Sequence, residues 1–251
     1  MVSTRRATVA SRTLADQLRP IVHVHGVVRA GDNVRVDVER GRARIQAGRI
    51  AFDAASVLAD AGDLAPAFER TLEAFEQTGI ASTPRVTTLK KTPIDATALV
   101  LAWANTDSTP RDPARRLALR VAGVVGNALL SRAATETTTG ISLIPWKRAH
   151  CPCCGASPDL ALATSSRRTL ICWRCDTRWR TDQRGCIGCG ASGSPAIVRV
   201  PSPYLGYELA ICNSCGRYLK ERRGALTHEL LVERTLTAGL DEAAQLRGLR
   251  A

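Results

Sequence analysis

Apolar residues recur with a helical period in the first half of the chain. After Asp112 and Pro113, apolar side chains fall at Leu117, Val121, Val124, Val125, Ala128 and Leu129. A spacing of three and four residues places them on one side of a helix. Asp is a favoured N-cap and Pro a favoured first helical residue. The pattern therefore predicts a helix that begins at residue 113.

Shorter segments of the first half carry weaker signals. Residues 66–75 place Phe68, Leu72 and Phe75 on one face, and residues 94–103 are also apolar enough for a helix. Residues 82–92 contain Pro84 and two adjacent lysines, which favours a loop. We therefore expect helices at 66–75 and 94–103, separated by an irregular connection.

The two ends of the chain differ in how clearly they are patterned. Residues 34–38 alternate like a strand, whereas Leu14, Leu18, Ile21 and Val22 recur like a helix, so the first fifty residues stay ambiguous. Leucines spaced along residues 226–246 predict a closing helix.

Composition supports a folded protein with an aliphatic core. The chain has 251 residues, 45% of them hydrophobic and 4% aromatic. Its formal net charge of +12 invites nucleic-acid binding, but the arginines are scattered and acidic residues are intermixed. Eight metal-bound thiolates would add −8 and two divalent ions +4, which lowers the formal charge from +12 to +8. Nucleic acid is therefore a disfavoured partner.

Membrane insertion and export are not expected. The longest apolar run, Val121 to Leu130, is shorter than the roughly 18–20 residues that a span needs. Arg5 and Arg6 are not followed by the apolar stretch of an export signal. We expect a cytoplasmic protein, whose thiols are kept reduced, so its cysteines are better explained as metal ligands than as disulfides.

All nine cysteines lie between residues 151 and 215, and eight of them form four C-x-x-C pairs. The pairs are Cys151/Cys154, Cys172/Cys175, Cys186/Cys189 and Cys212/Cys215. Such a pair forms a tight turn, here called a knuckle, with both sulfurs on one side. Two knuckles joined by a β-hairpin supply four sulfurs for one tetrahedral metal ion. The sequence therefore predicts two metal ions, each held by four thiolates.

Several details of these sites stay open. Pairing of neighbouring knuckles is the simplest arrangement, and the alternative joins the first knuckle to the third. Gly155, Gly190 and Gly216 follow three of the knuckles, where a positive φ would turn N–H groups toward sulfur. Cys153 is left over, either as a small buried residue or as a reactive or substitute ligand. Composition alone favours zinc.

Conventional catalytic motifs do not appear in the sequence. Nothing resembles a Ser/His/Asp triad or a nucleotide fingerprint, and His228-Glu229 lacks the second histidine of a metalloprotease helix. His23 and His25 lack a third ligand, and His150 beside Cys151 is at most a neighbour of the metal site. We therefore do not expect an enzyme.

The cysteine pairs lie within three longer motifs. The first is Cys151-Pro152-Cys153-Cys154-Gly155 followed by Pro158. The second is Cys172-Trp173-Arg174-Cys175-Asp176-Thr177-Arg178-Trp179, followed by Cys186-Ile187-Gly188-Cys189-Gly190. The third ends in Cys212-Asn213-Ser214-Cys215-Gly216-Arg217-Tyr218-Leu219-Lys220. Together these motifs resemble the FdhE family of formate dehydrogenase accessory proteins, and the resemblance is concentrated between residues 150 and 220.

This resemblance implies an α+β fold: a helical N-terminal domain, two tandem rubredoxin-like or zinc-ribbon modules, and a C-terminal helix. The corresponding ranges here are 1–148, 149–184, 185–225 and 226–251. It implies a cytoplasmic role in maturing respiratory formate dehydrogenase by binding its molybdenum-containing catalytic subunit. It also shifts the expected metal from zinc to iron in both sites. The oligomeric state is not implied.

Candidate contact residues lie in and around the cysteine region. Trp179 and Tyr218 are expected to pack against the hairpins, whereas Tyr204 is the better candidate for contact with a partner. Arg167-Arg168 and Arg222-Arg223 are expected to be solvated charges, with docking of an acidic surface as the alternative. The competing functions are a zinc-ribbon nucleic-acid module and a rubredoxin-like electron carrier.

Overall fold

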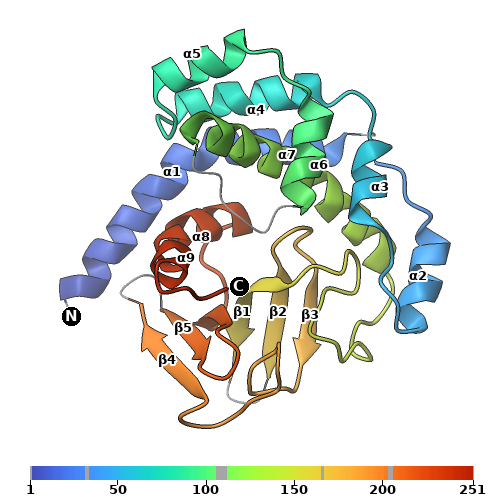
Figure 1. Ribbon diagram of the computed structural model, residues 1–251, viewed down its shortest axis with the longest axis vertical. Coiled ribbons are helices and arrows are strands. Elements are labelled where there is room, and N and C mark those ends of the chain that lie inside the picture. Colours follow the sequence, from blue (N-terminus) through green and yellow to red (C-terminus); the bar gives the residue numbers. More distant parts are fainter. Residues whose placement is uncertain (1, 32–33, 106–111, 165–166, 203–205, 251) are drawn as a thin grey trace. The chain divides into compact units, whose positions relative to one another are not determined.

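The computed structural model describes residues 2–31, 34–105, 112–164, 167–202 and 206–250. It has the α+β fold expected from the sequence, with helices, a six-stranded sheet and closing helices (Figure 1). The chain divides into two compact units. One, the helical unit, is Gln17–Ile141, and the other, the ribbon unit, is Met1–Asp16 with Ser142–Ala251. The four domain ranges drawn from the sequence stay predictions.

Seven helices lie in the described part of the first 141 residues. They are α1 (Val2–Ala30), α2 (Val38–Gln46), α3 (Ala54–Ala59), α4 (Ala65–Gln77), α5 (Thr83–Lys91), α6 (Ala96–Asn105) and α7 (Pro113–Thr138). Four aspartates begin helices by accepting a hydrogen bond from a backbone N–H of the first turn: Asp37, Asp53, Asp95 and Asp112. These caps satisfy donors that have no partner inside the helix.

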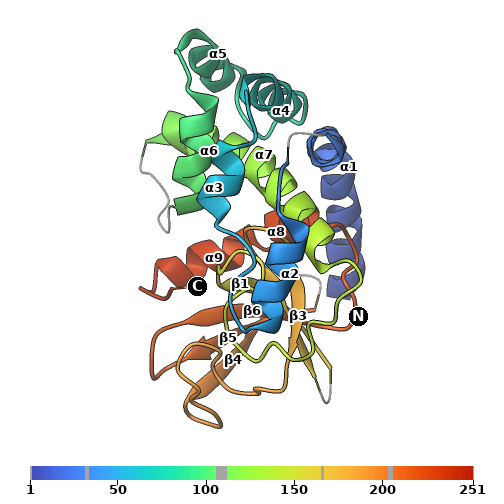
Figure 2. The ribbon, with the colours of Figure 1, turned by 90° about the vertical axis from the view of Figure 1, so that its right-hand side faces the viewer.

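Helix α7 is the central element of the helical unit (Figure 2). It packs against α2, α3, α4, α5 and α6. Among the described helices it alone is long and apolar enough to cross a membrane, but 83% of its most apolar stretch is buried in the protein. Its apolar side chains therefore form the core that the sequence pattern predicts.

The indole of Trp103 on α6 lies directly against α7 at two glycines. A Cβ atom added at Gly126 would come within 2.4 Å of the Trp103 ring, and one at Gly123 within 2.8 Å. Real side chains do not approach this closely, so the contact between α6 and α7 depends on glycine at both positions.

Some local expectations were wrong. Residues 82–92, predicted as a loop, form helix α5, because Pro84 lies in the first turn where it needs no donor, and Val86 and Leu89 share a buried face. In the first fifty residues, where the sequence left strand and helix open, residues 34–38 form no strand and Asp37 caps α2. The closing helix is two helices, α8 (Leu230–Leu236) and α9 (Ala238–Gln245).

The ribbon unit contains one sheet of six strands. They are β1 (Pro158–Ala163), β2 (Arg168–Cys172), β3 (Arg178–Thr181), β4 (Ile197–Pro201), β5 (Tyr207–Cys212) and β6 (Tyr218–Arg223). Their order is β3-β2-β1-β6-β5-β4. All neighbours are antiparallel except β1 and β6, which run parallel with Leu160 opposite Lys220.

The sheet is built from the same motif used twice. Each half follows the order knuckle, strand, strand, knuckle, strand, first with β1 to β3 and then with β4 to β6. The two expected modules are therefore present, and the β1–β6 pairing joins them into a single sheet. Because β1 and β6 are parallel, all four knuckles fall at the end of the sheet where these two strands begin.

Helices α8 and α9 cover one face of this sheet. Two buried clusters hold them: Leu160, Ile171 and Tyr207 pack against leucines 226, 230 and 240, while Leu209, Tyr218 and Ala244 pack beside Leu240 and Leu249. Burial of these side chains contributes about 1.5–3 kcal/mol for each large one. The buried carboxylate of Glu233 also stabilises the packing of α8 on the sheet, because it accepts hydrogen bonds from the Tyr207 hydroxyl and two backbone N–H groups.

We predict opposite effects for two glycine substitutions in the helical unit. Gly126→Ala places a methyl group against Trp103, and overpacking costs about 1–3 kcal/mol. Gly26→Ala in α1 meets no atom within 4 Å and gains helix propensity of up to about 1 kcal/mol. Thermal unfolding followed by circular dichroism should show a lower Tm for the first and an equal or higher Tm for the second. An unchanged Tm for Gly126→Ala would contradict the close contact between the Trp103 ring and α7.

Candidate metal centres

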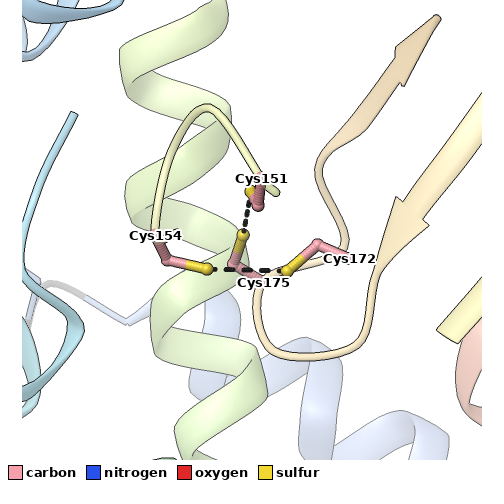
Figure 3. A group of neighbouring side chains, drawn as sticks. All are labelled: Cys151, Cys154, Cys172 and Cys175. Carbon is pink, nitrogen blue, oxygen red and sulfur yellow. Dashed lines mark hydrogen bonds between the residues drawn. The ribbon is translucent and has the colours of Figure 1, made fainter. Parts of the chain in front are cut away.

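The first candidate site is formed by the knuckles at either end of the β1–β2 hairpin. Figure 3 shows its four sulfurs pointing toward one another. The Sγ atoms of Cys151 and Cys175 are 3.5 Å apart, as are those of Cys154 and Cys172. All four cysteines are buried. Here this group is called site 1.

The second candidate site, site 2, repeats this arrangement around the β4–β5 hairpin. The Sγ atoms of Cys186 and Cys215 are 3.6 Å apart, and those of Cys189 and Cys212 are also 3.6 Å apart. Cys189 is exposed and Cys215 half-buried, unlike any member of site 1. The structure thus pairs neighbouring knuckles, not the first with the third.

The sulfur spacing fits a metal ion and does not fit disulfides. Within each site all four Sγ atoms lie within 4.8 Å of one another. A tetrahedral ion with bonds of about 2.3 Å to sulfur separates its ligands by about 3.8 Å, close to the distances seen here. A disulfide needs about 2.05 Å. Either zinc or iron suits such a site, because four thiolates in a tetrahedron bind both.

All four knuckles have the same backbone hydrogen bonds. The N–H of the first cysteine donates to the carbonyl five residues on, as from Cys151 to Ala156 at 2.8 Å. The N–H four residues on donates back to the first cysteine, as from Gly155 at 3.1 Å. The residue after each knuckle has a positive φ, which confirms the expectation for Gly155, Gly190 and Gly216.

Additional donors reach the sulfurs. Backbone N–H groups donate to the first sulfur of three knuckles: Cys153 to Cys151, Arg174 to Cys172 and Gly188 to Cys186, at 3.3–3.4 Å. In site 1 the hydroxyl of Thr177 lies 3.0 Å from the Cys175 sulfur. Hydrogen bonds of this kind spread the negative charge that four thiolates place around one cation.

The second knuckle departs from the others because Asp176, not glycine, has the positive φ of 60°. Asp tolerates this conformation better than most residues. Its carboxylate also accepts a 2.6 Å hydrogen bond from Arg234 of α8, which donates to Asp159 at 2.8 Å and to the Cys172 carbonyl at 2.8 Å. Burial opposes the charge of Arg234, but the two aspartates outweigh it and raise the arginine pKa.

The end of the chain holds the fourth knuckle. The backbone N–H of Arg250 donates to Gly216, and its carbonyl accepts from Tyr218, both at 2.9 Å. The Arg250 guanidinium also donates to the Cys215 carbonyl. The closing segment, from α8 onward, therefore supports both sites: Arg234 holds the second knuckle and Arg250 the fourth.

In each quartet the surroundings lower the pKa of one cysteine, which therefore loses its proton most readily. At Cys151 burial opposes ionisation, but hydrogen bonds from neighbouring cysteine thiols outweigh it and hold the pKa well below the usual range. At Cys212 burial is likewise outweighed, mainly by the Cys215 N–H, and the pKa falls to about 7. Burial raises the pKa of Cys172. It also raises the pKa of Cys215, to about 12. Binding of a cation therefore releases the remaining protons and strengthens as pH rises.

Other residues singled out from the sequence lie near the sites without joining them. Cys153 is fully buried beside site 1 but outside its quartet. Trp179 and Tyr218 are buried, as expected for packing residues. Tyr204, the contact candidate, lies outside the described residues. The ring of His150 meets the edge of Trp146. In the helical unit, His25 bonds to Asn127 at 2.8 Å, a role that its spacing from His23 did not suggest.

The fold and the sites define a protein with two four-cysteine modules fused into one sheet and a separate helical unit. The same fold occurs in the crystal structure of the FdhE protein from Pseudomonas aeruginosa, with a TM-score of 0.66 and 16% sequence identity. The match covers 95% of this chain and 90% of that one. No family model matches the sequence, and no curated protein matches it significantly.

The two sites should lose metal at different rates. A chelator must reach the ion, and Cys189 and Cys215 leave site 2 accessible whereas site 1 is closed. With excess chelator and a chromogenic metal indicator, we expect two phases of equal amplitude whose rates differ at least tenfold. Cys189→Ser should remove the fast phase alone. A single phase, or loss of the slow phase in this variant, would contradict the difference in access.

Replacing Arg234 should weaken site 1 selectively. Arg234→Met leaves Asp159 and Asp176 without their shared cation. Because the Arg234 side chain is 20% exposed, the free energy of unfolding in urea should fall by about 2–4 kcal/mol, somewhat less than the roughly 3–5 kcal/mol of a fully buried pair. It should also accelerate the slow phase of metal release and leave the fast phase unchanged. Arg247→Met, which removes an exposed arginine of the same segment, is the matched control. Equal effects of the two variants would refute the role assigned to Arg234.

Proposed function

We propose that this protein is an accessory protein of the FdhE family that acts in the assembly of formate dehydrogenase. The observation that carries the proposal is the fold shared with an FdhE protein over 95% of the chain. It is supported by the sequence motifs, because the residues that resemble the family are those that build the two quartets. In this proposal the chain works in the cytoplasm and catalyses no turnover of its own.

The proposed client is the molybdenum-containing catalytic subunit of formate dehydrogenase. The metal sites suit a binding module better than a reaction centre, because all four thiolates of each quartet are used by the ion and leave no position for substrate. Each ion then fixes two knuckles and the hairpin between them. A rigid surface of this kind loses less entropy when a partner binds.

Iron is the metal we propose for both sites. The sulfur geometry accommodates ferric or ferrous iron as well as zinc, and the resemblance to FdhE proteins favours iron. Iron would supply one-electron redox chemistry at the site. The cysteines would hold the ion. In site 1 the backbone N–H groups and the Thr177 hydroxyl would reduce the negative charge on the sulfurs that bind it.

Client binding should depend on the metal. The double variant Cys172→Ser with Cys175→Ser removes half of the site 1 ligands, so its affinity for the catalytic subunit should fall at least tenfold in biolayer interferometry. Cys153→Ser is the matched control, because it changes a buried cysteine of the same module outside the quartet. That variant should bind like the unmodified protein.

Two results would refute the proposal. One is no measurable binding of the metal-loaded protein to the catalytic subunit. The other is unchanged binding by the Cys172/Cys175 variant after metal analysis confirms that site 1 is empty, since the client surface would then not need the metal.

A further inference from the structure

The face of the sheet opposite α8 and α9 contains a charged cavity of 480 Å³. Lys220 faces α9, where it bonds to Asp241, so its neighbour Glu221 faces the other way, into this cavity. The cavity lies where β1 and β6 end, and at one edge it reaches the third knuckle, because the side-chain amide of the lining residue Gln183 donates to the Cys186 carbonyl. Five arginines line it, and we call it the arginine basin: Arg167, Arg168, Arg184, Arg199 and Arg223.

The floor of the basin is a fixed ion cluster shared by the two modules. Glu221 of β6 is 1% exposed and pairs with Arg168 of β2 and Arg199 of β4. Arg168 also donates to the carbonyls of Gln183 and Gly185, at 3.1 and 2.8 Å. A buried carboxylate held from both sides gives the cavity a rigid base.

The rim of the basin carries the excess positive charge. Every acidic residue that lines the cavity already has a cation: Glu221 and Glu208 pair with arginines, and Asp182 with Lys147. Within the described residues, no ion pair is formed by the three exposed arginines of the rim, Arg167, Arg184 and Arg223. Arg167 lies in the β1–β2 connection, Arg184 in the β3–β4 connection and Arg223 at the end of β6, and the three meet at one cavity.

We propose that the arginine basin binds a small ligand that carries at least two oxyanion groups, either phosphoryl or carboxylate. The planar guanidinium fork pairs with both groups through two hydrogen bonds. The volume lies in the range of small-molecule sites, about 300–1,000 Å³. The five arginines of the basin meet within one concavity, whereas an extended acidic chain would need a longer basic track.

The test is calorimetric titration of the full-length, metal-loaded protein at low ionic strength. Inorganic pyrophosphate tests the phosphoryl class and citrate the carboxylate class. The basin variant is Arg167→Gln with Arg223→Gln. The control is Arg178→Gln with Arg180→Gln, which removes the same charge from exposed positions of β3 that alternate away from the basin.

We expect at least one of the two anions to bind, with affinity reduced at least tenfold in the basin variant and within twofold of the unmodified protein in the control. Unchanged Tm and metal content show that each variant folds, and Arg184→Gln alone serves if the double variant does not. Absence of binding by both anions, or equal weakening in the control, would overturn the proposal. So would binding of a Glu-rich peptide at the basin when neither small anion binds.

Discussion

The parallel pairing of β1 with β6 is the interaction on which the ribbon unit depends. Each module alone has three strands and one quartet, and this pairing joins the two modules into one sheet. It brings both quartets to the same end and gives α8 and α9 a continuous apolar face. It also lets Glu221 of one module meet Arg168 of the other across the boundary. The arginine basin is therefore a product of the fusion and belongs to neither module alone.

The closing segment packs on this sheet and also contacts two of the knuckles that form the quartets. Arg234 fixes the knuckle that contains the positive φ of Asp176, and Arg250 fixes the last knuckle through its backbone. Each of these contacts holds a turn through groups other than the cysteine sulfurs. A metal ion would join the two knuckles of each hairpin, so its binding free energy would also contribute to folding. The stability of the helices on the sheet and the affinity for metal are consequently coupled in site 1.

Local signals in the sequence were sufficient for the knuckles and for helix α7. The C-x-x-C spacing specifies the turn by itself, and Asp112-Pro113 marks the start of α7. Long-range contacts were not readable in this way. Nothing in the sequence pairs β1 with β6. Nor does it show that Asp176 takes the positive φ that glycine takes in the other three knuckles, with its carboxylate held by Arg234, 58 residues away. Arg222 and Arg223 look equivalent in sequence, yet alternation along β6 sends one to Glu233 and the other to the basin.

The presence of two four-thiolate metal centres is the central claim of this account. Native mass spectrometry of protein purified without oxygen tests it directly, with elemental analysis and a visible spectrum to identify the ion. We expect two metal ions per chain and no disulfide among the eight cysteines of the quartets. Ferric iron in such a site absorbs visible light, whereas zinc does not. A chain that carries fewer than two ions, or that joins these cysteines in disulfides, would contradict the account.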